Sequence, residues 1–168
     1  MRNLEDKMKI NRAVLTYGVA KTFKENVDFS HVELDPNHVR KIENCVVKAT
    51  ATDYETILRI ELEINALVIG VCSYSLEDVE LKLKIEDEIN FSDDENDPDC
   101  YFCNDTIIDL DEYILGILLA NVPVRIVKKG AKLPEDGKGY RVISQDQYEK
   151  EKENSSDPRW DKLNELDL

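Results

Sequence analysis

The chain is poor in the residues that build catalytic and cofactor-binding loops. Its six glycines and two histidines are scattered, and the glycines form neither a dinucleotide-binding nor a phosphate-binding loop. There is no His-Glu-x-x-His zinc motif and no Gly-x-Ser-x-Gly nucleophile motif. We therefore expect a protein that is not an enzyme and that needs no cofactor.

Long apolar runs are also missing. The longest, Tyr113 to Val124, is shorter than the roughly 20 residues of a membrane-spanning helix. The first seven residues contain no apolar run of the kind found in a signal peptide. The four cysteines are then most simply reduced thiols. We expect a cytoplasmic location, with no membrane and no small-molecule substrate among the partners.

The negative charge is abundant but unevenly distributed. The net charge is −14, and residues 85–124 contain twelve acidic residues and no Lys or Arg. Residues 125–143 reverse the sign, with six basic residues against two acidic ones. The sequence therefore predicts a polarised surface rather than a uniformly acidic one.

Alternating apolar and polar residues predict antiparallel strands across Lys21–Phe91. The continuous apolar run Leu67–Cys72 predicts a strand that is buried on both faces. Short connections predict a meander, and we place them at Asp53–Tyr54, Asn65–Ala66 and Leu76–Asp78. About five such strands should curl into a strongly twisted sheet or an open barrel.

Two helices are expected after the strands. Asp109 and Glu112 form an acidic capping box that opens an apolar helix to Asn121. Ser144 and Gln147 form a second box, which opens a polar helix to about Asn154. The predicted fold class is α+β: a curled, mainly antiparallel sheet or open barrel packed against one apolar helix, with a polar C-terminal helix and tail.

We assign residues 1–143 to a single domain and residues 144–168 to the polar helix and a flexible tail. Within the domain, residues 92–104 are predicted to form a mobile loop, because like charges repel one another and apolar anchors are few.

The cysteines and the acidic loop do not match known metal motifs. Cys100 and Cys103 form a C-x-x-C pair, but Cys45 and Cys72 are isolated, so the four ligands of structural zinc are not evident. A calcium loop starting at Asp93 would need Gly and Glu where Pro98 and Asn104 stand. We expect no metal site, and the role of Cys100 and Cys103 stays open.

Two charged regions are candidate binding surfaces. Basic residues with an aromatic residue among them suit RNA phosphates and a stacked base: Arg125, Lys128, Lys129, Lys132, Lys138, Tyr140 and Arg141. The acidic loop suits a cationic protein, through Asp93, Asp94, Glu95, Asp97 and Asp99.

Landmarks across Met8 to Leu166 resemble the YceD family, the large ribosomal RNA accumulation proteins of bacteria and plastids. One stretch, residues 71–79, is similar to the family's Cys-x-x-Cys-Leu-Glu element. A second runs from residue 108 to residue 123 and has an Asp-Pro-Arg tail behind it. The residues that carry the resemblance are Cys72, Leu76, Glu77, Asp109, Leu110, Pro123, Asp157, Pro158 and Arg159.

The resemblance implies a non-enzymatic factor that supports large-subunit rRNA accumulation and ribosome biogenesis, by binding rRNA or a precursor particle. The alternative is an acidic adaptor that holds a basic ribosomal protein. The sequence departs from the family pattern at Ser75, which replaces the second cysteine of the motif. A zinc site formed by cysteine pairs in relatives cannot be built here.

Overall fold

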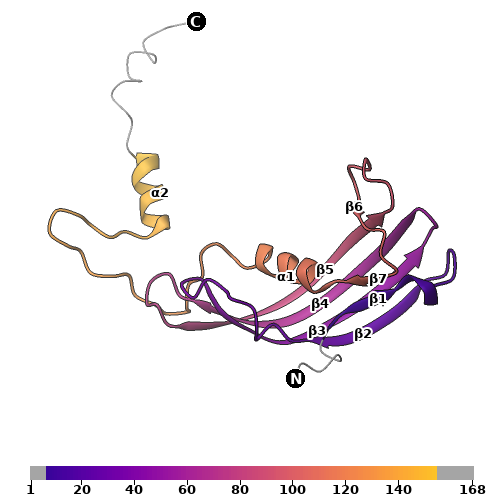
Figure 1. Cartoon of the computed structure of the whole chain (residues 1–168). Helices are drawn as coiled ribbons and strands as arrows, with labels where there is room; N and C mark the ends of the chain where they lie inside the picture. The colour runs from indigo at the N-terminus through magenta and orange to yellow at the C-terminus, as the bar shows by residue number, and fades with distance from the viewer. Residues whose placement is uncertain (1–6, 155–168) are drawn as a thin grey trace, which may run out of the picture.

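The computed structural model describes residues 7–154 and has an α+β fold (Figure 1). Seven strands and two helices follow one another as β1 (Lys9–Asn11), β2 (Lys21–Val27), β3 (Val39–Asp53), β4 (Ile57–Val71), β5 (Asp78–Ser92), β6 (Tyr101–Phe102), β7 (Ile107–Asp109), α1 (Asp111–Ala120) and α2 (Gln145–Asn154). A single 3-10 turn, Arg12–Val14, follows β1. None of the helices in this part of the chain is long and apolar enough to cross a bilayer.

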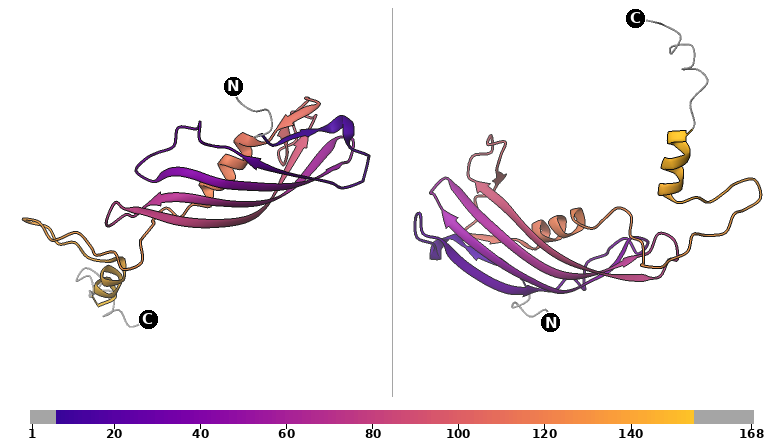
Figure 2. Two further views of the ribbon diagram at one scale, coloured as in Figure 1. Left: turned by 90° about the horizontal axis from the view of Figure 1, so that it is seen from below. Right: turned by 180° about the vertical axis from the view of Figure 1, so that it is seen from behind.

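The main sheet is open and mostly antiparallel. Its strand order is β2-β3-β4-β5-β6, and only the β5–β6 pair is parallel. The expected meander is therefore present, but the sheet does not close into a barrel. Figure 2 shows that the long strands curve together into a trough.

Strand β4 corrects one expected connection. We placed a turn at Asn65–Ala66, but β4 continues through both residues and pairs with β3 and β5 on its two sides. The reason is that the alternation keeps its parity, since Ile64, Ala66 and Val68 all face the core. The apolar run that we read as a separate strand is the second half of this one.

The core fills the concave side of the sheet. Helix α1 lies along this side (Figure 1), and Ile114, Leu118 and the preceding Leu110 are fully buried among the sheet side chains. Each such side chain contributes about 1.5–3 kcal/mol through its removal from water. The small β1–β7 sheet adds Met8 and Ile10 to the same core.

The start of α1 differs from the expected capping box. The helix begins at Asp111, and its N-cap is Leu110, which makes no side-chain cap bond. Asp109 belongs to β7 and pairs with Lys9, so its backbone is extended. Its carboxylate accepts from the Asp111 N–H at 3.1 Å and from Lys7 Nζ at 3.0 Å. The predicted capping box of Asp109 and Glu112 was wrong, because Asp109 is part of a β-strand and the helix begins two residues later.

At the start of α2, Ser144 and Gln147 each accept a hydrogen bond through the side chain from the backbone N–H of the other. The Gln147 N–H donates to the Ser144 hydroxyl at 3.2 Å, and the Ser144 N–H donates to Gln147 Oε1 at 3.1 Å. This is the geometry of a capping box.

The segment expected as an irregular loop, residues 92–104, contains ordered elements at both ends. Ser92 is buried within β5, and β6 lies between the acidic residues and α1. Tyr101 contacts Phe91 and Tyr113, with ring centroids 6.0 and 4.9 Å away. Aromatic residues distant in sequence therefore meet at this end of the segment. The mobility of residues 93–100 remains a prediction.

Candidate functional site

The β4–β5 connection, residues 72–77, forms a tight turn that we call the Cys72 turn. The Cys72 N–H donates to the Glu77 carbonyl at 2.8 Å, and the Leu76 N–H donates to the Cys72 carbonyl at 2.9 Å. Leu76 has a φ of 58°, a left-handed conformation that is uncommon for a residue with a side chain. Arg40 donates to the Leu76 carbonyl at 3.2 Å. The turn thus leaves the Leu76 side chain 70% exposed.

The basic segment, residues 125–143, is seated on this turn at its beginning. The Ser73 N–H donates to the Ile126 carbonyl at 2.7 Å. The Ile126 side chain is 3% exposed and packs over Gly70, where an added Cβ would lie 2.4 Å from Ile126 Cδ1. A glycine at position 70 therefore provides the space in which the segment is anchored.

Cys72 is the centre of this junction. Its sulfur accepts from the Lys128 N–H at 3.3 Å and from the Ser75 N–H at 3.5 Å. The Lys128 N–H, followed by the bonds from Ser75, lowers the pKa of the Cys72 thiol to about 7. Its side chain is fully buried, and the sulfur acts as a hydrogen-bond acceptor inside the turn.

The position of the family's second cysteine serves the same turn. The Ser75 hydroxyl donates to Glu77 Oε2 at 3.1 Å. In residues 7–154 no group of three or more His, Cys, Asp or Glu side chains is placed to hold a metal ion. The motif residues Cys72, Leu76 and Glu77 therefore share one structural unit.

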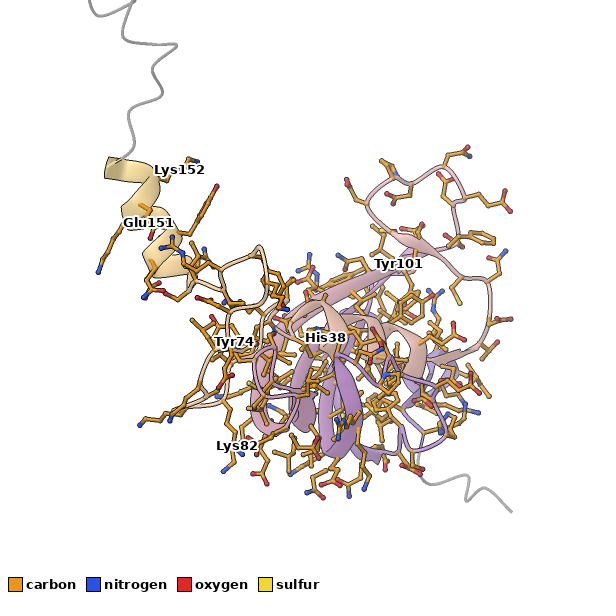
Figure 3. The ribbon with its side chains drawn as sticks, turned by 90° about the vertical axis from the view of Figure 1, so that its left-hand side faces the viewer. His38, Tyr74, Lys82, Tyr101, Glu151 and Lys152 are labelled. Atoms are coloured by element: carbon orange, nitrogen blue, oxygen red, sulfur yellow. The ribbon has the colours of Figure 1, made fainter. Side chains whose placement is uncertain are left out.

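Arg125 connects the turn to α2. Its guanidinium stacks on the Tyr74 ring, 4.8 Å from the centroid, and bonds to the Tyr74 hydroxyl. The same guanidinium donates to Gln145 Oε1 at 3.0 Å. Figure 3 shows Tyr74 on the side of the molecule from which α2 extends with Glu151. A stacked cation of this kind contributes about 0.5–1 kcal/mol at an exposed site.

Two further cations have intramolecular partners. Lys128 Nζ lies 3.1 Å from Glu77 Oε2, and this hydrogen bond lowers the pKa of the Glu77 carboxyl. Arg141 lies 2.6 Å from Glu151 Oε2 on α2. Carboxylates within the protein therefore neutralise Lys128 and Arg141. Together with Arg125, these predicted RNA-contacting residues make contacts within the protein.

The remaining basic candidates face solvent. Lys129, Lys132 and Lys138 are exposed, and within residues 7–154 none of them makes an ion pair. Tyr140 is 64% exposed, but one edge of its ring lies against Gly137, where an added Cβ would be 2.2 Å away. These four residues leave side-chain surface available to a partner.

The acidic candidates lie elsewhere. Asp93, Asp94, Glu95 and Asp99 are exposed and Asp97 is half-buried. Local bonds shape their loop: the Asn96 N–H and amide donate to Asp94 at 2.9 and 3.1 Å and thereby lower the pKa of its carboxyl. Views from both sides place this loop and the basic segment at opposite ends of the sheet (Figures 1 and 2).

Cys100 and Cys103 are half-buried beside the same loop. Burial, followed by a bond to Asp97, raises the pKa of the Cys100 thiol. The Cys103 N–H donates to the Ser92 carbonyl at 2.8 Å. The backbone of Cys103 thus fixes the chain after β6 to the end of β5.

The other motif residues frame α1. Asp109 is ion-paired with Lys7, Leu110 is fully buried, and Pro123 lies between the helix and the basic segment. Asp157, Pro158 and Arg159 lie outside the described residues. The sequence reasoning missed Tyr74 and Arg40, which hold the basic segment and the turn. Tyr74 stands inside the family element, and this position is the one signal that could have pointed to it.

The fold and the site together define a small α+β protein with a basic segment at one end of an open sheet and an acidic loop at the other. The chain matches a family model described as large ribosomal RNA subunit accumulation protein YceD over residues 60–167. The match includes the Cys72 turn, α1 and the basic segment, and the chain belongs to this family. No curated protein and no solved structure matches it.

Proposed function

We propose that this protein supports large-subunit rRNA accumulation without catalysing a reaction, by binding that RNA or a precursor particle through the basic segment. The family description supplies the biological role. The observation that carries the binding surface is the exposure of Lys129, Lys132 and Lys138 without an ion-pair partner in the described residues. The segment reaches away from the sheet beyond its anchor on the Cys72 turn (Figure 1).

The physical basis is electrostatic. A lysine that contacts a phosphate releases a condensed counterion, which favours binding most at low salt. Lys128 should contribute less to RNA binding than the sequence predicts, because it is ion-paired with Glu77. The Tyr140 ring offers a face for one unpaired base.

The test compares two double charge reversals. Lys129→Glu with Lys132→Glu should weaken binding to ribosomal RNA fragments, measured by filter binding at several salt concentrations. The control is Lys24→Glu with Lys82→Glu, two exposed lysines on the main sheet. The basic-segment variant should lower the slope of log affinity against log salt by about 0.7–0.9 for each phosphate that the protein no longer neutralises.

Cosedimentation of both variants with large-subunit precursor particles in cell extracts should show the same order. Equal losses from the two double variants would leave only general charge attraction and contradict a specific role for the basic segment. Unchanged binding in both would contradict direct RNA contact.

A second candidate is an adaptor that holds a basic ribosomal protein on the acidic end. The observation that favours it is the separation of the two charged regions across the sheet (Figure 2). An acidic end at this distance can attract a cationic protein without repelling RNA from the basic segment. Neutralising Asp93, Asp94 and Glu95 tests it. This change should release a basic protein from the precursor complex and leave RNA affinity unchanged or higher.

A further inference from the structure

A cleft of about 820 Å³ opens at the acidic end of the molecule. Its walls come from β6, β7, the first turns of α1 and the loop that follows β2, segments brought together only by the fold. Tyr101, labelled in Figure 3, belongs to β6, the strand from which Phe102 lines the cleft.

The cleft presents apolar side chains to solvent. Phe102 is 46% exposed and Ile107 is 56% exposed, and both line it together with the half-buried Leu115. Ile108, 3% exposed, joins the cleft wall to the core, and Tyr101, the neighbour of Phe102, packs against Phe91 and Tyr113. Apolar side chains surrounded by a polar rim are the composition of a protein-binding surface.

The rim is anionic. Asp105 and Glu112 line the cleft and make no ion pair within residues 7–154. Lys7 is the one Lys or Arg among the lining residues, and Asp109 and Asp111 engage it at 3.0 and 3.5 Å. The acidic loop runs directly into β6. The uncompensated charge around this apolar floor is therefore negative.

We propose that this cleft binds a lysine- or arginine-rich segment of a partner protein that inserts an apolar side chain between Phe102 and Ile107. The inference rests on the second candidate function and gives it a site. Charge complementarity selects a cationic occupant and steers its approach, while the apolar floor supplies contact that charge alone does not. An RNA strand is excluded as the occupant, because its phosphates would face the Asp105 and Glu112 carboxylates.

The test uses the full chain and three labelled nine-residue peptides, with fluorescence anisotropy as the readout. The first peptide has six lysines around a central Leu-Phe-Leu, the second has six lysines around three alanines, and the third has six glutamates around Leu-Phe-Leu. The first should bind at least about tenfold more tightly than the second, since it alone buries apolar surface. The third should not bind.

Matched variants locate the binding. Ile107→Ser should weaken binding of the first peptide about fivefold, whereas Val124→Ser, an exposed apolar residue outside the cleft, should change it less than about twofold. Asp105→Asn with Glu112→Gln should also weaken binding of the first peptide, most at low salt. The control Glu61→Gln with Glu80→Gln, on the main sheet, should not weaken it. Far-UV circular dichroism checks that every variant is folded.

Equal affinity for the leucine-containing and alanine-containing peptides would overturn the proposal, as would equal effects of Ile107→Ser and Val124→Ser. Concentration-dependent self-association that Ile107→Ser abolishes would also overturn it, in favour of a second copy as occupant. A different result would contradict the adaptor function and leave the cleft proposal intact. In that case the cleft binds the first peptide, but Ile107→Ser does not change which proteins are recovered with the precursor particle.

Discussion

The two ends of the curved sheet hold their adjoining segments with different side chains. At the Cys72 turn, the basic segment is held by the Lys128 N–H, which donates to the Cys72 sulfur, by its Ile126 carbonyl, which accepts from the Ser73 N–H, and by the buried Ile126 side chain. At the acidic end, β6 and α1 are held by ring contacts among Phe91, Tyr101 and Tyr113. The first end therefore contains a thiol whose pKa is about 7, and the second adds aromatic packing to the pairing of β6 with β5.

The cysteines show the same contrast at the level of single residues. Cys45 and Cys72 are both buried. Burial raises the pKa of Cys45 to about 12, whereas N–H donors lower the pKa of Cys72 to about 7. Depth in the structure thus does not decide the charge of a thiol; the donors that surround it do.

The largest expected effect is at the aromatic end. Phe91→Ala removes a fully buried ring that packs edge-on against Tyr113 at 5.1 Å. We expect a loss of about 3–5 kcal/mol in the free energy of unfolding, measured by chemical denaturation. Tyr148→Ala on α2, whose ring is 57% exposed, is the matched control and should cost less than about 0.5 kcal/mol. Similar losses would show that the aromatic cluster does not secure this end.

The next effect concerns the anchor of the basic segment. Ile126→Ala should cost about 2 kcal/mol, the lower end for a buried isoleucine because the site is at the edge of the core. The Ser73 amide should then exchange faster, since its acceptor is the Ile126 carbonyl. Val124→Ala, 95% exposed, should change neither quantity. If Ser73 stays protected in Ile126→Ala, the segment is held by something other than this anchor.

A pH series separates the two buried cysteines. The folded Cys72 pKa of about 7 lies below the unfolded value of about 8.5. Its contribution is therefore fully present above about pH 8.5 and is lost as pH falls through about 7. The folded Cys45 pKa is raised to about 12, so its contribution is present below about pH 8.5 and is lost as pH rises above that value.

The measurement is the unfolding free energy of wild type minus that of Cys72→Ala, and separately minus that of Cys45→Ala, between pH 6 and pH 9.5. The first difference should rise with pH and the second should fall. Parallel slopes would mean that the Lys128 and Ser75 donors do not lower the pKa of the Cys72 thiol.

Amide exchange tests the acidic loop itself. Residues 93–100 should exchange quickly because like charges repel, while the Cys103 amide should be protected by its bond to the Ser92 carbonyl at 2.8 Å. Strong protection throughout residues 93–100 would contradict the predicted mobility.

The smallest effect is expected from the solvent-facing lysines. Lys129→Glu with Lys132→Glu should change the unfolding free energy by less than about 0.5 kcal/mol per substitution, because neither lysine has an ion-pair partner in the described residues. Lys128→Glu should cost more, since it places a carboxylate beside Glu77. If all three cost the same, the Lys128–Glu77 pair does not contribute to stability.

Much of the fold could be predicted because its signals are local. The parity of apolar residues in β4 and β5 defines two strands, and the residues of this parity are the ones that are buried in β4. The apolar helix near residues 109–121 and the family membership also follow from short stretches of sequence. The turn expected at Asn65–Ala66 was wrong even so, because alternation indicates a strand but does not show where it ends.

Tertiary structure decided which residues meet, and with them the character of each site. Nothing near Tyr74 in the sequence shows that it stacks on Arg125, fifty-one positions away. Asp109 was placed in a helix cap by its own neighbours, but pairing with Lys9 puts it in a strand. The cleft lined by Phe102 and Ile107, the separation of the basic and acidic ends, and the lowered pKa of the Cys72 thiol arise in the same way. Composition determines how much charge and apolar surface a chain has, whereas strand pairing and packing determine which groups are close enough to interact.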